Sequence, residues 1–234
     1  MRTGSATRTV LDVEPLSLDV EPLSLRVVKT HPSPLPSAPD GHTLGQVTQS
    51  VLQTDRITLV PLSDVHLELE VELDSDPEVM RYLTGRARTR AEVEDAHERR
   101  LKTAEPVPGL GFWIGRVAGH LVGWWLLQPP ERPDQGPVQG QAELGYRLLR
   151  RYWRQGLASE GSSELLRHGF DDLNLTRIFA ETMSANTGSR ATMAAVGLQY
   201  VRTFHHDLDL DLPDVHLGEV EYAVTRAEWR ATRP

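Results

Sequence analysis

The stretch RRYWRQGLASE, residues 150–160, decides how this chain is interpreted. A strand-like run, AELGYRLL, leads into it, and residues suited to a helix follow its single glycine, Gly156. The first amides of a helix have no partners inside the helix, and the helix dipole adds partial positive charge at the same end. Gly156 lets the main chain approach a ligand, and three arginines add full charges nearby. The stretch therefore predicts a site for an anion such as a phosphate or diphosphate.

Two other interpretations of the same eleven residues were possible. A loop that binds a nucleotide triphosphate needs a lysine followed by serine or threonine, and neither is present, which argues against kinase or ATPase chemistry. A tight turn from strand to helix with solvent-facing arginines would need the same residues and bind nothing. The stretch alone leaves the anion site and the plain turn open.

The chain has 234 residues, enough for one sizeable hydrophobic core. We predict a disordered or low-complexity N-terminal tail over residues 1–50 and one folded domain over residues 51–231. The tail repeats DVEPLSL at 12–18 and 19–25 and continues into the proline-rich THPSPLPSAPDGH. Two short copies cannot build a repeat protein, and prolines at this density interrupt helices and strands.

Composition limits the class of function. The chain contains no cysteine, so disulfides, thiolate metal sites and a cysteine nucleophile are excluded. The longest apolar run, LVGWWLL at 121–127, is too short to span a bilayer, and the first residues lack the apolar stretch of a signal peptide. We therefore expect a cytoplasmic protein. The formal net charge of -8 argues against generic nucleic-acid binding and suits a cationic partner such as an amine.

Apolar periodicity and turn residues predict the secondary structure. Strands are expected at 55–62, 111–117, 120–128, 142–149, 176–183, 198–204 and 218–225. Helices are expected from Ser63 or Asp64 to about Leu73, from Asp76 onward, from Thr89 to about Lys102, over 158–173 and over 188–197. Ala118 and Gly119 suit a tight hairpin between the second and third strands. An antiparallel front half followed by alternating strands and helices predicts an α+β fold.

A second motif, SANTGSRATMAAVGLQYV at 184–201, places an asparagine and a serine three residues apart at the start of a helix that follows a strand. Together with TDRITLVPL, SDPEVMRYL, GFWIGRV, ELGYRLLRRYWRQGLASEG and the closing TRAEW, it resembles the GNAT superfamily of acyl-CoA-dependent N-acetyltransferases. The resemblance covers about residues 52–231 and is to the branch similar to ribosomal-protein N-terminal acetyltransferases. It implies a mixed, mostly antiparallel sheet of six to seven strands, flanked by helices and splayed between the fourth and fifth strands.

The resemblance also assigns residues to the coenzyme. The family loop reads glutamine or arginine, two residues, glycine, one residue, then glycine or alanine; Gly156 and Ala158 match, and Trp153 departs at the first position. The loop acts mainly through main-chain amides, so the departure casts little doubt on binding. The main chain at Leu148 would pair with the pantetheine arm, and Asn186 would contact the coenzyme beside the fifth strand. The residues expected to hold the diphosphate are Arg150, Arg154, Gln155, Gly156, Leu157, Ala158 and Ser159.

Moving an acetyl group from a thioester to an amine needs a neutral amine, a donor to the oxyanion and a proton for the leaving thiolate. The amide near Leu148 could serve the oxyanion. Many family members use a tyrosine as proton donor, but alignment places Met193 there. We predict Ser189 as the acid, although it could equally be a helix-capping or first-turn hydroxyl. We predict Glu143 as the base, facing the cleft through a strand bulge; an ordinary salt bridge is the alternative, and Glu181 or a water-mediated base is the reserve.

Three other features are expected to take no direct part in the chemistry. The segment HHDLDLDLPDVH at 205–216 carries metal-ligand residue types but lacks the spacing of a calcium loop, so we predict a loop on the substrate side and no metal site. The basic cluster at 99–102 is predicted to be a solvated helix face. Trp113, Trp124 and Trp125 are predicted to pack within the sheet.

The chain is therefore predicted to be an N-acetyltransferase that moves an acetyl group from acetyl-CoA directly to a primary amine. A non-catalytic acyl-CoA-binding sensor or regulatory module is the alternative, which coenzyme binding without turnover would distinguish. Protein N-termini, polyamines and aminoglycoside-like compounds all suit an acidic protein, so the acceptor stays open. No nucleic acid, membrane or metal partner is expected, and a homodimer is left open because nothing in the sequence determines the oligomeric state.

Overall fold

The computed structural model describes residues 49–103, 107–205, 212 and 214–232. The predicted tail over 1–50 lies almost entirely outside these residues, and so does much of the segment 205–216.

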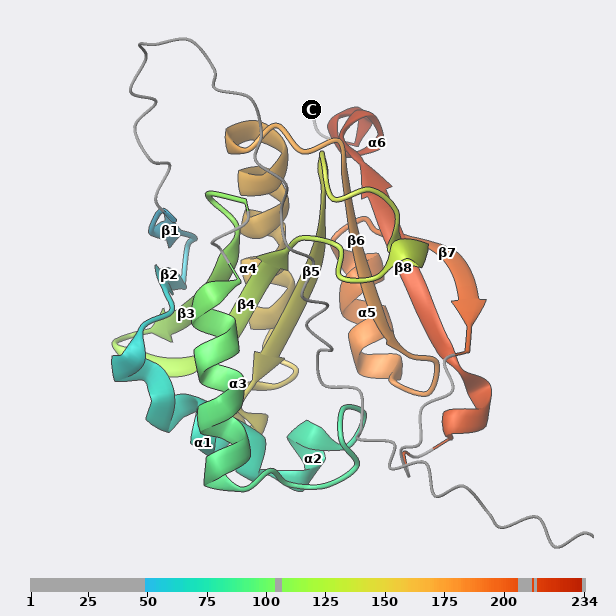
Figure 1. Cartoon of the computed structure of the whole chain (residues 1–234). Coiled ribbons are helices and arrows are strands. Elements are labelled where there is room, and N and C mark those ends of the chain that lie inside the picture. Colours follow the sequence, from blue (N-terminus) through green and yellow to red (C-terminus); the bar gives the residue numbers. More distant parts are fainter. Residues whose placement is uncertain (1–48, 104–106, 206–211, 213, 233–234) are drawn as a thin grey trace, which may run out of the picture. The chain divides into compact units, whose positions relative to one another are not determined.

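These residues form one mixed sheet of eight strands (Figure 1). The strands are β1 (Leu52–Gln53), β2 (Thr58–Pro61), β3 (Gly111–Val117), β4 (His120–Gln128), β5 (Gln141–Leu148), β6 (Arg177–Met183), β7 (Gln199–Phe204) and β8 (Glu219–Thr225). Their spatial order is β1-β2-β3-β4-β5-β6-β8-β7, and every neighbouring pair is antiparallel except β5 with β6. Seven strands correspond to predicted ones. The eighth, β1, has two residues, too few for a periodic pattern to predict it.

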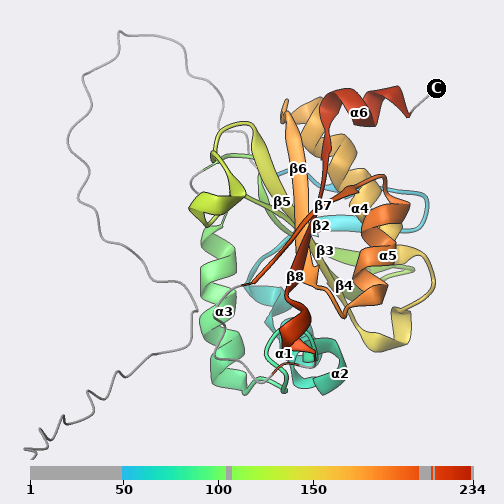
Figure 2. The same cartoon turned by 90° about the vertical axis from the view of Figure 1, so that its right-hand side faces the viewer.

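Helices cover both faces of the sheet. They are α1 (Leu67–Ser75), α2 (Pro77–Met80), α3 (Arg90–Lys102), α4 (Leu157–Arg167), α5 (Thr187–Ala195) and α6 (Arg226–Ala231). Shorter 3₁₀ segments span Asp64–His66, Pro133–Gln135, Arg150–Tyr152 and Val215–Leu217. Helices α1 to α3 lie on one face, and α4 and α5 lie on the other (Figures 1 and 2).

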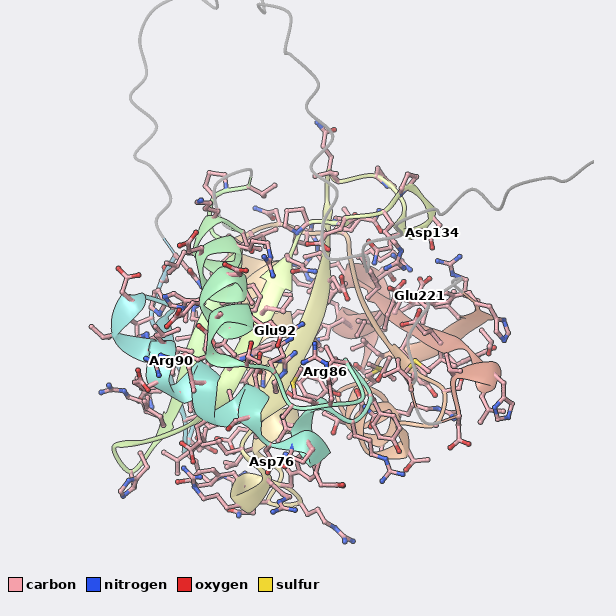
Figure 3. The ribbon with its side chains drawn as sticks, turned by 60° about the horizontal axis from the view of Figure 1, so that its bottom comes forward. Asp76, Arg86, Arg90, Glu92, Asp134 and Glu221 are labelled. Atoms are coloured by element: carbon pink, nitrogen blue, oxygen red, sulfur yellow. The ribbon has the colours of Figure 1, made fainter. Side chains whose placement is uncertain are left out.

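Local sequence explains where α3 begins. Thr89 and Glu92 form a capping box, in which each side chain bonds the other residue's amide. Arg86 adds an ion pair to Glu92 at 2.6 Å, and the three charged side chains Arg86, Arg90 and Glu92 lie along the start of the helix (Figure 3). The predicted helix from Thr89 to about Lys102 is therefore confirmed.

Helix α4 ends earlier than predicted. The sequence pattern carried the helix to residue 173, but the α-helix stops at Arg167 and His168–Asp172 forms a π-helical turn. His168 is buried there and its ring nitrogens lie 2.8 Å from Asp172 Oδ2 and 3.3 Å from Gly109 O. Apolar spacing cannot distinguish the two helix types, because one shifted hydrogen-bond register keeps the same face buried.

The sheet separates two hydrophobic cores. The larger core lies on the side of α4 and α5 and includes Trp113, Trp125 and Phe170, all fully buried. The smaller core lies on the side of α1 to α3 and includes Phe112 and Trp124. The prediction that the tryptophans pack in the sheet is confirmed.

A buried ion network joins α1, α3 and β5, and it corrects one prediction. Asp74 is fully buried and pairs with Arg147, and its Oδ2 lies 3.4 Å from both Arg88 and Arg100. Arg100 also pairs with buried Glu70. Arg100 belongs to the basic cluster predicted to be a solvated helix face; its side chain instead points inward, because two buried carboxylates need its charge.

The sheet splits between β5 and β6. These strands pair only where Gln141–Glu143 faces Arg177–Phe179. Beyond that point β5 stays paired with β4 as far as Leu148, while β6 follows β8 as far as Met183. Figure 1 shows the two strands diverging, with α5 behind the opening. The predicted splay is therefore confirmed, and it leaves one edge of β5 without a strand partner.

Helix α4 packs directly on the sheet through a glycine. A Cβ built on Gly161 would lie 2.5 Å from the Trp125 ring, and Trp125 Nε1 donates to Ala158 O at 3.1 Å. This contact seats the first two turns of α4 against β4.

Gly161→Ala is expected to lower the free energy of unfolding by about 1–3 kcal/mol, because the added methyl group overlaps a fully buried ring. Urea denaturation measures the effect. Gly188→Ala, in the first turn of α5, is the matched control: its nearest atom would be 3.8 Å away, so alanine should stabilise by up to about 1 kcal/mol. Equal changes for both variants would contradict this view of α4 packing.

Candidate active site

The loop between β5 and α4 has a backbone that exposes several amides. Gly156 caps α4 in a left-handed conformation (φ 79°), and Arg154 is also left-handed (φ 59°). The first hydrogen bond within the helix joins Glu160 N to Gly156 O at 3.0 Å. The amides of Leu157, Ala158 and Ser159 therefore have no partner inside α4. Such a turn before a helix is a typical concavity for an anion.

Residues far away in sequence hold this loop. Arg56, between β1 and β2, donates to Gln155 O at 3.0 Å and pairs with Glu160 at 2.6 Å. Glu160 also accepts from Thr54 Oγ1 at 2.6 Å. The sequence alone does not point to Arg56, because it precedes Glu160 by 104 positions and no motif links the two.

Trp153, the departure from the family motif, ties the loop to β5. Its indole Nε1 donates to Leu148 O at 2.7 Å. The next amide, that of Leu149, donates to Val122 O on the β4 side at 3.0 Å. Main-chain groups of successive strand residues point in opposite directions, so the Leu148 amide points toward the split. The Trp153 indole already bonds the Leu148 carbonyl. The Leu148 amide is therefore the main-chain group of this residue that is available to a ligand.

The three arginines of the loop differ in their surroundings. Arg150 lies 3.4 Å from Asp76, which lies at the start of α2 (Figure 3), and Arg151 lies 2.5 Å from Glu72. Both pairs are exposed, so each contributes little and could be exchanged for a phosphate. Within the part of the chain that the structure describes, Arg154 has no ion-pair partner. Positive charge is therefore available beside the free amides.

The asparagine of the second motif caps a helix. Asn186 Oδ1 accepts from Ser189 N at 3.1 Å, and its Nδ2 donates to Thr182 Oγ1 at 3.1 Å. Asn186 thus caps α5, and the spacing of three residues to Ser189 is capping geometry. A contact between Asn186 and the coenzyme stays a prediction.

Ser189 lies in the first turn of α5 but does not cap it. Its hydroxyl lies 3.0 Å from the phenol of Tyr146, which comes from β5 on the other wall of the split. Met193, one turn further along α5, is buried in the larger core. No local pattern in the sequence points to Tyr146, because it meets Ser189 only in the folded structure, 43 positions further along the chain.

Glu143 lies at the last paired position before β5 and β6 diverge. Gln128 Nε2 donates to its carboxylate at 3.0 Å. Burial, with the nearby charge of Glu181, raises the pKa of Glu143 to about 7. The expected bulge in β5 is absent: its register with β4 is regular from Glu143 to Leu148. The end of pairing with β6, and not a bulge, places this carboxylate at the split.

Glu181, the predicted reserve base, is already engaged. Its Oε2 accepts from Arg132 at 2.7 Å and from Gln135 at 3.0 Å, and its side chain is 6% exposed. Both donors bond the same carboxylate oxygen, so Glu181 is held in an ion pair with a loop that precedes β5. A second set of ion pairs lies on the neighbouring strands. Glu221 on β8 pairs with Arg202 on β7 at 2.6 Å, and Arg202 also pairs with Asp134 at 2.9 Å (Asp134 and Glu221 are labelled in Figure 3).

Two expectations concern absences. Among the described side chains, no group of three or more histidines, cysteines, aspartates or glutamates is arranged to hold a metal ion. Much of the segment 205–216, the candidate that the sequence raised, lies outside the described residues. No helix in the described ranges is long and apolar enough to cross a membrane.

Known proteins share both the sequence pattern and the fold. A family model described as an acetyltransferase (GNAT) domain matches residues 56–199. The FsC-acetyl coenzyme A-N(2)-transacetylase of Aspergillus fumigatus is 41% identical over 185 residues, covering 77% of this chain and 78% of that protein.

Solved structures agree at the level of the fold. The ribosomal L7/L12 α-N-protein acetyltransferase RimL in complex with coenzyme A has a TM-score of 0.62 at 15% identity, covering 75% of this chain and 98% of that one. Spermidine N-acetyltransferase from Vibrio cholerae, in complex with CoA and spermine, has a TM-score of 0.61 at 14% identity, covering 76% of this chain and 99% of that one. With the matched domain, the split sheet and the glycine loop in agreement, this chain belongs to the GNAT family of acetyltransferases, which use acetyl-CoA as the acyl donor.

Proposed function

We propose that this chain acetylates a primary amine by direct transfer from acetyl-CoA, with the coenzyme lying in the split between β5 and β6. The observation that carries the proposal is that the free edge of β5 leads directly to the free amides at the start of α4. An extended pantetheine arm can add to such an edge as a strand would. The diphosphate then reaches the amides of residues 154–159, which lie one short turn further along the chain.

Glu143 is the proposed base. A carboxylate with a pKa of about 7 can accept a proton near neutral pH, whereas an ordinary carboxylate is too weak a base to do so effectively. As the amine nitrogen attacks the thioester carbon, Glu143 takes a proton from the amine. The Leu148 amide would donate to the oxyanion, and the carbon–sulfur bond then breaks. Ser189 supplies a proton to the leaving thiolate. Because the amine attacks the thioester directly, no covalent enzyme intermediate forms.

The acceptor is proposed to be cationic before it reacts. The chain carries a net charge of -8, and burial raises the pKa of Glu143. A cation beside this carboxylate would favour its charged form. The name of the Aspergillus fumigatus relative specifies acetylation at a nitrogen numbered 2, and an α-amino nitrogen carries that number in an amino acid. Amino-acid derivatives with a free α-amino group are therefore the first acceptors to test.

An acceptor screen tests the proposal. Purified protein is mixed with acetyl-CoA and, separately, an amino-acid amide, a peptide with a free N-terminus, a polyamine or an aminoglycoside, and thiol release is followed with a disulfide dye. The chain has no cysteine, so the dye sees only released coenzyme. We expect release with at least one amine, in equal amount to the acetylated product found by mass spectrometry.

Two other outcomes would contradict the proposal. Coenzyme A binding in calorimetry without turnover on any amine would support a non-catalytic acyl-CoA-binding module. If the protein does not bind coenzyme A, the proposed coenzyme site between β5 and α4 is wrong. A cytoplasmic location stays a prediction from composition, and cell fractionation tests it.

A further inference from the structure

A tyrosine links the two walls of the split. Tyr146 lies on β5 and packs against the larger core, on the side of α4 and α5. Its phenol oxygen lies 3.0 Å from Ser189 Oγ and 3.0 Å from Ser189 O, both on α5. The strand and the helix are thus joined by hydrogen bonds at the place where β5 has already left β6.

The phenol has one proton, and both Ser189 oxygens lie 3.0 Å from it; the Thr192 hydroxyl also interacts with the phenol. When Tyr146 donates to the Ser189 carbonyl, the Ser189 hydroxyl can donate to the phenol oxygen. When the phenol turns to donate to Ser189 Oγ, the serine proton is released from this contact and can point elsewhere. A rotation of the phenol O–H alone therefore changes Ser189 from a hydroxyl that is bound into one that can donate to a ligand.

Ser189 by itself is a poor acid for the leaving thiolate. An aliphatic hydroxyl is a much weaker acid than a phenol, so a serine that gives up its proton needs a replacement at once. Burial raises the pKa of Tyr146, which keeps the phenol protonated over the neutral range. The side chain at the position expected to donate a proton from α5, Met193, has none to give.

We propose that Tyr146 is a positioning residue for the leaving-group proton, holding Ser189 in place and replacing the proton that Ser189 gives to the coenzyme A thiolate. This inference rests on the proposed function. When the carbon–sulfur bond breaks, the sulfur takes the Ser189 hydroxyl proton, and Ser189 Oγ takes the phenol proton. The amine proton has meanwhile gone to Glu143. The phenolate is then reprotonated and Glu143 deprotonated by solvent. These transfers balance for a neutral amine, and an acceptor that arrives as an ammonium cation releases one further proton to solvent before it attacks.

Tyr146→Phe tests the inference, because it keeps the ring and removes only the hydroxyl. With an acceptor that supports turnover in the unaltered protein, we expect kcat to fall about 100-fold, the low end of the range for a proton-transfer group. The KM for acetyl-CoA and the Kd for coenzyme A should stay within about twofold. Ser189→Ala should lower kcat similarly, and the double variant should be no slower than the slower single variant, since the two groups act as a unit.

Tyr200→Phe is the matched control. Tyr200 on β7 is exposed and its hydroxyl lies 2.9 Å from Thr203, far along the sheet order from β5. Its removal should leave kcat unchanged. A kcat for Tyr146→Phe equal to that of the unaltered protein would overturn the inference, and so would multiplicative losses in the double variant or a loss of coenzyme affinity that accounts for the defect. If the unaltered protein binds coenzyme A but acetylates no amine, both the proposed function and this inference are wrong. If the unaltered protein acetylates an amine and Tyr146→Phe does so at the same rate, only this inference is wrong.

Discussion

Glu143→Gln is expected to lower kcat/KM for the amine acceptor by about 100- to 10,000-fold, the range typical of a positioned general base. Glutamine keeps the shape of the side chain and its contact with Gln128, but it cannot accept a proton. Steady-state kinetics at pH 8 measure the loss. Glu164→Gln, which alters an ion pair with Arg167 on α4, is the control and should retain full activity. Full activity in Glu143→Gln would show that another group, or water, removes the amine proton.

The pH profile gives a second test of Glu143. The base must be ionised to act, and burial places its pKa at about 7. The kcat/KM of the unaltered protein should therefore rise with pH and level off above about 7, with any further limb belonging to the amine. Glu143→Gln should lack the limb near pH 7. A limb in the unaltered protein near the ordinary glutamate value of 4.5 would contradict the assignment.

The same substitution should increase stability at alkaline pH. The folded pKa of Glu143 lies above the ordinary value of 4.5, so between about pH 4.5 and 7 the folded state binds more protons than the unfolded state. Stability contributed by this group therefore falls as pH rises through that window, by at most about 3 kcal/mol. Glutamine does not titrate, so Glu143→Gln does not lose this stability as the pH rises. Urea denaturation should show Glu143→Gln more stable than the unaltered protein at pH 8 and nearly equal to it at pH 4.5.

Ser159→Asp is expected to raise the Kd for coenzyme A about 100-fold. Ser159 lies in the first turn of α4, beside the free amides proposed to hold the diphosphate. An aspartate there would face a ligand of like charge, and two unit charges about 4 Å apart near a protein surface repel by about 4 kcal/mol before salt screening. A loss of about 2.7 kcal/mol corresponds to the 100-fold change. Isothermal titration calorimetry with coenzyme A measures it.

Stability separates this effect from misfolding. Acidic side chains in the first turn favour a helix, so Ser159→Asp should melt at the same temperature as the unaltered protein or slightly higher. Ser163→Asp places the same charge one turn later on α4 and should keep coenzyme affinity within a fewfold. If Ser159→Asp binds coenzyme A normally, the loop around Gly156 is a plain turn and the diphosphate lies elsewhere.

Local patterns in the sequence determined most of the elements and the location of the glycine loop proposed to hold the coenzyme. A capping box, a two-residue hairpin turn and a glycine before a helix each act within a few residues, so their outcome can be worked out without knowing the rest of the fold. The helix at Thr89, the turn at Ala118 and the left-handed conformation of Gly156 are of this kind. The same reasoning failed for β1, which is too short, and for the end of α4, where two helix types share one apolar face.

Tertiary structure alone decided which side chains meet in the split. Tyr146 and Ser189 lie 43 positions apart in the sequence, and their contact creates a candidate path for a proton. Arg132 and Glu181 lie 49 positions apart, and their ion pair engages a carboxylate that was a candidate base. Arg56 supports the loop before α4, and Arg100 turns inward, because of contacts with residues distant in sequence. Such contacts depend on strand order and on where pairing between β5 and β6 stops. Residue type and local spacing do not predict the strand order or the point where pairing stops. Both depend on how the whole sheet packs between its two layers of helices.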